Sequence, residues 1–117
     1  MGYYTGYSLT VKGVDSLDKF LKLQNTLDEK GLIGYVFDKG EYFNEQKTAN
    51  FYEFDTQKWY AHLEDMTLIS KLFPDMTFRL RGDGEEWDDR WEEYYKNGKS
   101  EHCEGRLVYD EPTTIVW

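Results

Sequence analysis

The sequence is poor in the residues that disulfide-rich, zinc-binding and nucleic-acid-binding proteins need. It has one cysteine, Cys103, which excludes an internal disulfide and a thiolate cluster for zinc. It has 14 basic residues against 23 acidic ones, a net charge of -9. That charge disfavours direct binding to nucleic acid or to anionic lipid. We expect a protein of a reducing compartment, with no cofactor or metal implied.

Long apolar runs are also missing, whereas aromatic residues are abundant. No stretch approaches the roughly 20 apolar residues of a membrane span, and no basic start precedes an apolar stretch. These absences predict a cytoplasmic protein. Aromatic residues make up 18% of the chain, more apolar surface than a disordered chain of this charge would carry. Residues 1–117 are therefore expected to fold as a single domain.

The first half of the chain predicts a strand, a helix and two less regular strands. Tyr7, Leu9 and Val11 alternate with polar residues, which indicates a strand closed by Gly13. Apolar residues then recur at helical spacing, between an Asp15 or Ser16 cap and Gly31. The runs 33–37 and 48–54 are interpreted as strands, the second without a clear buried face. The loop 41–50 resembles nothing we recognise.

The second half predicts a helix followed by a strand. Met66, Ile69 and Phe73 share one helical stripe, His62 begins the helix, and Pro74 stops it. Residues 76–80 then alternate as a strand, which we expect Gly82 to end.

A hairpin is expected towards the end of the chain. Asn97-Gly98 favours a two-residue turn, so residues 89–96 and 99–109 should pair. A rival interpretation makes Trp87, Trp91, Tyr94 and Tyr95 one face of a helix. The tail, residues 113–117, is expected to add an edge strand or to close over the core.

This order of elements predicts an α+β fold of the ferredoxin-like, split βαβ kind. Two helices would cover one face of an antiparallel sheet, with an extra hairpin near the C-terminal end. The segments MGYYTGYSLTV and KWYAHLEDMTLISKLFPDMTFRLRGDGEEWDDRWEEYYKNGK, more than half of the chain, resemble small ferredoxin-like accessory proteins of phages, prophages and plasmids. The resemblance implies this fold and a mobile-element origin, and it brings no catalytic residues.

The strongest functional signal is DGEEWDDRWEE, residues 83–93, which has seven acids in eleven positions. Clustered negative charge with aromatic anchors suits a basic partner surface, because complementary potentials steer encounter and rings supply contact area. We expect a non-enzymatic, anti-CRISPR-like inhibitor that occupies the basic nucleic-acid site of a host defence protein. The residues expected to bind that partner are Glu85, Glu86, Trp87, Asp88, Asp89, Trp91, Glu92 and Glu93.

The acidic segment and the histidines give little support for metal binding or catalysis. The acids do not have the spacing of an EF-hand, so a solvated turn or a partner surface is favoured over a cation site. His102 and Cys103 are adjacent, so on a strand they would point to opposite faces. A small buried thiol and a surface or capping histidine are favoured over a nucleophilic pair.

An alternative function uses the uncovered face of the sheet. Arg79 and Arg81 would lie opposite the apolar residues of their strand, with Tyr4 and Tyr52 as possible stacking groups. Such a face could sequester an anionic signalling nucleotide, with arginine on phosphate and tyrosine on the base. The simpler expectation is that these arginines pair across strands with acidic neighbours.

Overall fold

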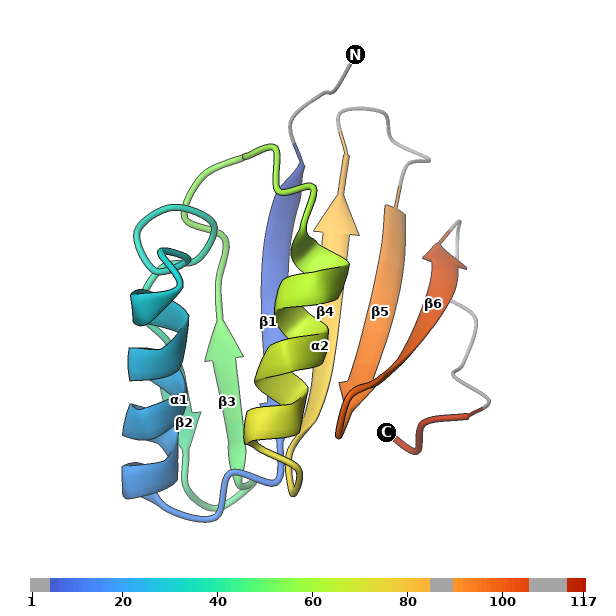
Figure 1. The fold of residues 1–117 in the computed structure, drawn as a ribbon. Helices are drawn as coiled ribbons and strands as arrows, with labels where there is room; N and C mark the ends of the chain where they lie inside the picture. The colour runs from blue at the N-terminus through green and yellow to red at the C-terminus, as the bar shows by residue number, and fades with distance from the viewer. Residues whose placement is uncertain (1–4, 85–89, 106–113) are drawn as a thin grey trace.

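The computed structural model describes residues 5–84, 90–105 and 114–117. Their fold is α+β, with a six-stranded antiparallel sheet in the order β2-β3-β1-β4-β5-β6 and two helices on one face of it (Figure 1). The strands are β1 Gly6–Lys12, β2 Glu41–Phe43, β3 Thr48–Phe51, β4 Thr77–Asp83, β5 Arg90–Lys96 and β6 Lys99–Gly105. The helices are α1 Leu17–Glu29 and α2 His62–Leu72. Neither described helix is long and apolar enough to cross a membrane.

The best-marked elements form for the local reasons that their sequences indicate. Ser16 caps α1, because its hydroxyl accepts a hydrogen bond from the Lys19 amide, and Gly31 follows the helix with a φ of 76°. In the β5–β6 turn, Asn97 and Gly98 have φ values of 47° and 81°, as a turn of this kind requires. Residues 90–96 therefore form a strand, and the helical interpretation of that segment is wrong.

The run 33–37 is not a strand, contrary to the sequence prediction. The carbonyl of Leu32 accepts hydrogen bonds from the amides of Tyr35, Val36 and Phe37, which folds the run into a compact turn. Val36 and Phe37 are fully buried there, so this apolar run enters the core as a turn. The strand that follows α1 and pairs with β3 is instead β2, Glu41–Phe43. It lies within residues 41–50, which were expected to be a loop.

The core lies between the helices and the sheet. Leu9, Val11, Phe78 and Leu80 extend from the central strands to meet Met66, Ile69 and the buried residues of α1. Ala49 and Phe51 of β3 are buried on this side, which settles the face that the sequence left ambiguous. The alternate residues of the strands, among them Ser8, Thr10 and Asn50, therefore lie on the sheet face opposite the helices, here called the open face.

Candidate functional site

Exposed carboxylates gather at the end of the sheet where β1 begins and β4 ends. Asp83, the last residue of β4, pairs with Gly6 of β1, and the Glu53 carboxylate lies directly over Gly6. Asp55 lies just before Gln57, which pairs with Thr5 ahead of β1. The first turn of α2 begins at this same end of the sheet (Figure 1). The exposed carboxylates, here called the acidic end, are Glu53, Asp55, Glu64 and Asp83.

Large apolar side chains are exposed among these acids. Phe54 is 55% exposed and lies between Glu53 and Asp55, and Tyr60, which precedes α2, is 74% exposed. Leu63, next to Glu64, is also exposed. Exposed rings among charges provide the contact area that protein interfaces use as anchors. The exposure of these residues was not predictable from the sequence, because it depends on how residues 52–61 cross the end of the sheet.

The opposite end of the molecule carries lysines. Lys12 ends β1, Lys47 precedes β3, Lys71 lies in the last turn of α2, and Lys96 and Lys99 flank the β5–β6 turn. Acids lie at this end as well: Asp15 contacts Lys19 and Lys47, and Asp18, Glu45 and Asp75 are close by. The lysines offset these acids, whereas the carboxylates of the acidic end outnumber the cations Lys58 and Arg90 beside them, which favours the approach of a basic partner there.

The predicted residues Glu85, Glu86, Trp87, Asp88 and Asp89 lie outside the described residues. Their place in the chain still matters, because β4 ends at Asp83 and β5 begins at Arg90. These two strands are neighbours, and Asp83 pairs with Arg90 across them, with the side chains 3.4 Å apart. The end of β4 and the start of β5, which flank these residues in the sequence, therefore both lie at the acidic end.

Glu92 is not part of an exposed acidic surface, contrary to the prediction. It is 3% exposed and lies on the open face. Its Oε2 accepts hydrogen bonds from Nε and Nη2 of Arg81, at 3.0 and 2.6 Å, and lies 3.7 Å from Nε of Arg79. Tyr94 donates to its other oxygen. Burial and then the charge of Glu92 raise the pKa of Tyr94 to about 12. The expected pairing of the arginines with acidic neighbours is confirmed.

Glu93 is also withdrawn from the surface, on the helix side of the sheet, where both histidines of the chain meet it. It is 6% exposed. Tyr95 donates a hydrogen bond to its Oε1 at 2.5 Å, and Nδ1 of His102 lies 2.9 Å from its Oε2. Nδ1 of His62 is 2.8 Å from Oε1, a close electrostatic contact without the alignment of a hydrogen bond. Both histidines of the chain therefore contact the same buried carboxylate.

The pKa values in this cluster favour an ionised Glu93 beside a neutral Tyr95. Burial opposes ionisation of Glu93, but the contacts from His62, Tyr95 and His102 outweigh it and hold the pKa of its carboxyl below the usual value. Burial, followed by the negative charge of Glu93, raises the pKa of Tyr95 well above its usual value. The cluster is an internal network around the Glu93 carboxylate, which stabilises this part of the fold and withdraws Glu93 from the surface offered to a partner.

Trp91 is not the free anchor that the sequence suggested. Its ring stacks on His62 with centroids 4.9 Å apart and lies 5.9 Å from that of His102. Across the strand, Gly82 makes room for it, because a Cβ at Gly82 would lie 2.3 Å from the indole. Gly82 therefore does not end the strand as predicted; β4 continues to Asp83. Trp91 is half-buried, so the exposed rings of Phe54 and Tyr60 at the acidic end are the better candidate anchors for a partner.

The open face brings together only part of the alternative ligand site. Tyr4 lies outside the described residues. Tyr52 follows β3, and its hydroxyl accepts a hydrogen bond from Asn50 of the open face, while Arg81 lies on this face beyond β1. Arg79 and Arg81 are both held by Glu92, as described above. Arginines already committed to a buried carboxylate are less available to a phosphate group, which weakens the support for nucleotide binding on this face.

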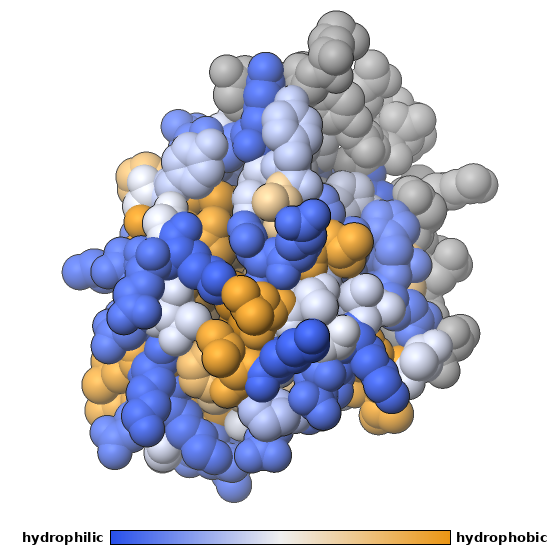
Figure 2. Space-filling model, viewed as in Figure 1, coloured by the Kyte–Doolittle hydropathy of each residue, from blue (hydrophilic) through white to orange (hydrophobic). Residues whose placement is uncertain are grey.

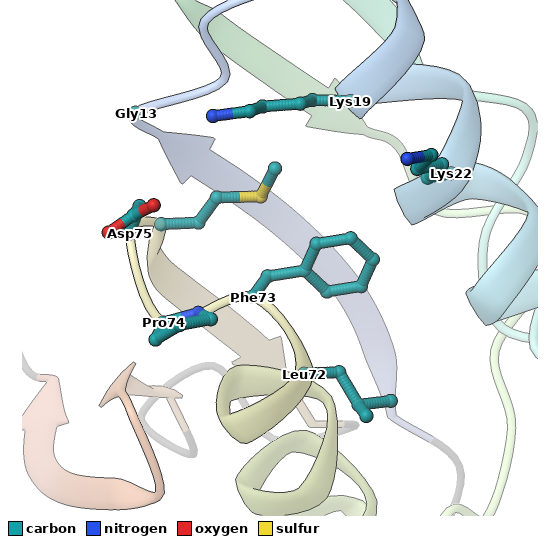
Figure 3. A pocket seen from close by; sticks show the side chains of 8 residues that line it. Gly13, Lys19, Lys22, Leu72, Phe73, Pro74 and Asp75 are labelled. Carbon is teal, nitrogen blue, oxygen red and sulfur yellow. The ribbon is translucent and has the colours of Figure 1, made fainter.

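The face formed by the helices has a pocket and an apolar patch. Apolar side chains gather near its centre, between charged groups (Figure 2), and exposed leucines occur on both helices. The pocket has a volume of about 240 Å³ and lies between the start of α1 and the segment after α2. Lys19 and Lys22 border it opposite Phe73 and Leu72 (Figure 3). Lys19 is engaged by Asp15 at 3.3 Å, so part of the positive charge there is already neutralised.

The described residues offer no metal site, and they place Cys103 and His102 on different faces of the sheet. They contain no group of three histidine, cysteine, aspartate or glutamate side chains placed to hold a metal ion. Cys103 is a buried thiol on the open face, as expected, whereas His102 lies with Glu93 on the helix side. The two side chains therefore point to opposite faces of β6, as predicted.

Comparison of the chain with protein-family models, with curated proteins and with solved structures finds no match.

Proposed function

We propose that the protein is a non-enzymatic phage or mobile-element protein of ferredoxin-like fold that binds and inhibits a host defence protein. Its acidic end would occupy a basic surface where that partner binds nucleic acid, as an anti-CRISPR protein does. The observation that carries the proposal is the gathering of Glu53, Asp55, Glu64 and Asp83 at the end of the sheet where β4 ends and β5 begins. Carboxylates presented together can replace phosphates on a basic surface.

The exposed apolar residues of the acidic end give the proposal its second support. Charge complementarity mainly raises the association rate and sets specificity, whereas buried aromatic anchors slow dissociation. Phe54 and Tyr60 supply such anchors beside the acids. A solvated acidic surface alone would need no large rings exposed within it.

The strand order supports the ferredoxin-like part of the proposal. The order β2-β3-β1-β4, with α1 after β1 and α2 after β3, is the arrangement of a split βαβ sandwich. In this interpretation, β5 and β6 are the extra hairpin. The hairpin lengthens the sheet and places the acidic segment between β4 and β5.

Charge reversal at the acidic end should weaken partner binding by at least about tenfold, or about 1.4 kcal/mol. Two variants test this: Glu53, Asp55 and Glu64 changed to lysine, and Glu85, Glu86, Asp88 and Asp89 changed to lysine. The tagged protein is used to capture proteins from host lysate at low salt, and each captured protein is identified by mass spectrometry. Affinity for the purified partner is then measured at rising salt, which should weaken it.

A matched control changes Asp18, Glu45 and Asp75 to lysine at the opposite end. This set reverses three charges and, like the first variant, includes one acid in the first turn of a helix. It should leave binding unchanged. Competition is the decisive measurement, since the partner's nucleic acid should displace the protein. Equal losses in the control and test sets, or a partner that binds the protein and its nucleic acid together, would contradict acidic mimicry.

A further inference from the structure

Residues 114–117, here called the tail strap, lie against the open face. The backbone amides of Thr114 and Ile115 both donate hydrogen bonds to Oε1 of Glu101, at 2.6 and 3.2 Å. Glu101 lies opposite Tyr94 in the β5–β6 register. One carboxylate on β6 therefore fixes the backbone of the tail strap over β5.

The side chains of the tail strap alternate between the sheet and solvent. Ile115 is 5% exposed and forms a small apolar cluster with Tyr94 and Cys103, whereas Val116 is 90% exposed. Trp117 faces the sheet again and meets Tyr94 edge to face, with centroids 5.7 Å apart. The sheet thus contacts an aliphatic side chain and, two positions later, an aromatic one.

Two cations complete the seat of the aromatic ring. Nζ of Lys12 lies 4.3 Å from the centroid of Trp117, and the guanidinium of Arg79 lies 4.7 Å from it. Lys12 also donates a hydrogen bond to the carbonyl oxygen of Trp117. The two cations favour an electron-rich ring at this position, tryptophan above all, and they favour neutral or acidic residues beside that ring.

The patch under the tail strap differs from the rest of the open face. β1 and β3 present Ser8, Thr10, Thr48 and Asn50 on this face, whereas Tyr94 and Cys103 form an apolar spot against which Ile115 and Trp117 of the tail strap pack. The tail strap holds this spot with few contacts. Residues 114–117 contain no strand, only Ile115 is buried, and Trp117 keeps part of its ring in solvent.

We propose that this patch is a binding site for an extended peptide segment of a partner protein, with an aliphatic residue two positions before an aromatic one. The tail strap occupies the site in the free protein, and the partner segment replaces it. The chemistry of the partner segment follows from the contacts: two successive amides for Glu101, an aliphatic side chain for Tyr94 and Cys103, and a ring for Lys12 and Arg79. The site is independent of the acidic end, which involves different residues.

The test uses the full chain with the double change Ile115→Ala and Trp117→Ala, which empties the seat and retains the sheet. The probe is a fluorescent, amidated peptide with the sequence of residues 112–117, PTTIVW. It should bind the double variant at least about tenfold more tightly than the unaltered chain, in which the tail strap competes, with a Kd below about 1 mM. Trp117→Ala alone, which retains Ile115, is the second variant in case the first loses its fold.

Two controls separate this site from nonspecific binding. The peptide PTTIWV has the same composition but puts the ring beside the aliphatic residue, so both cannot face the sheet; it should not bind. Adding Lys12→Ala to the double variant should weaken binding by about threefold, as expected for the loss of one exposed cation–π contact, whereas adding Lys99→Ala should not. Equal binding of the two peptides, or no gain in either tail variant, would overturn the proposal.

Discussion

Replacing Glu93 with alanine is expected to lower the free energy of unfolding by about 3 kcal/mol. The change leaves a cavity on the helix side of the sheet and removes the acceptor of the Tyr95 hydroxyl, which is buried with its ring fully covered. It also removes the negative charge that His62 and His102 both approach. Unfolding in urea, followed by circular dichroism, gives the value, provided that the slope with denaturant stays constant.

Glu45→Ala is the control for this measurement. Glu45 lies exposed in the turn between β2 and β3, so its loss should change the free energy of unfolding by no more than about 0.5 kcal/mol. A loss below about 1 kcal/mol for Glu93→Ala would mean that the cluster contributes little net stability. Binding by the acidic end should be unaffected, because Glu93 does not reach that surface.

The lowered pKa of Glu93 predicts a specific dependence of stability on pH. Because the folded pKa is depressed, the stabilisation by Glu93 is complete above the unfolded pKa of about 4.3 and is lost as the pH falls through the lower folded value. Between about pH 5 and pH 3, Glu93→Gln should therefore lose less stability than the unaltered chain. Parallel losses in the two proteins would contradict the assignment.

Elements with a local signal were predictable from the sequence. The alternation of β1, the cap of α1 at Ser16 and the Asn97-Gly98 turn each depend on a few neighbouring residues, and the structure has all three. The run 33–37 was not predictable, because a short apolar run such as IGYVF fits a buried strand or a buried turn equally well. The hydrogen bonds to the carbonyl of Leu32 favour the turn over the strand, and the apolar pattern of the sequence does not predict those bonds.

The candidate site was predictable only in part, for a different reason. Glu92 and Glu93 belong to the acid-rich segment 83–93, and nothing in its composition marks the point where the strand begins. Their burial depends on Arg81, His62 and His102, which come from three other elements. The acidic end likewise depends on tertiary placement, since Glu53, Glu64 and Asp83 are distant in the sequence. The net charge of the protein follows from its sequence, but the place in the fold where the exposed acids gather does not.

Gly82→Val is expected to lower the free energy of unfolding by about 3 kcal/mol, at the upper end of the usual cost of overpacking. A Cβ at this position would lie 2.3 Å from two atoms of the Trp91 indole. The ring has little room to move, because it stacks on His62 and meets Tyr7 and His102 on other sides. The added side chain must therefore push Trp91 out of its place or separate β4 from β5. Thermal and urea unfolding measure the loss.

A double-mutant cycle with Trp91→Ala distinguishes this clash from a general intolerance of valine in β4. Valine has a higher strand propensity than glycine, so without the indole it should be tolerated and should cost less than about 1 kcal/mol. The coupling between the two positions is then about 2 kcal/mol, as expected for side chains in direct contact. Equal costs in both backgrounds would show that Gly82 is required by the strand itself. A large coupling would show that Gly82 is required because it makes room for Trp91 between the two histidines. Trp91 in that position holds β5 against α2 and against β6, beside the acidic end.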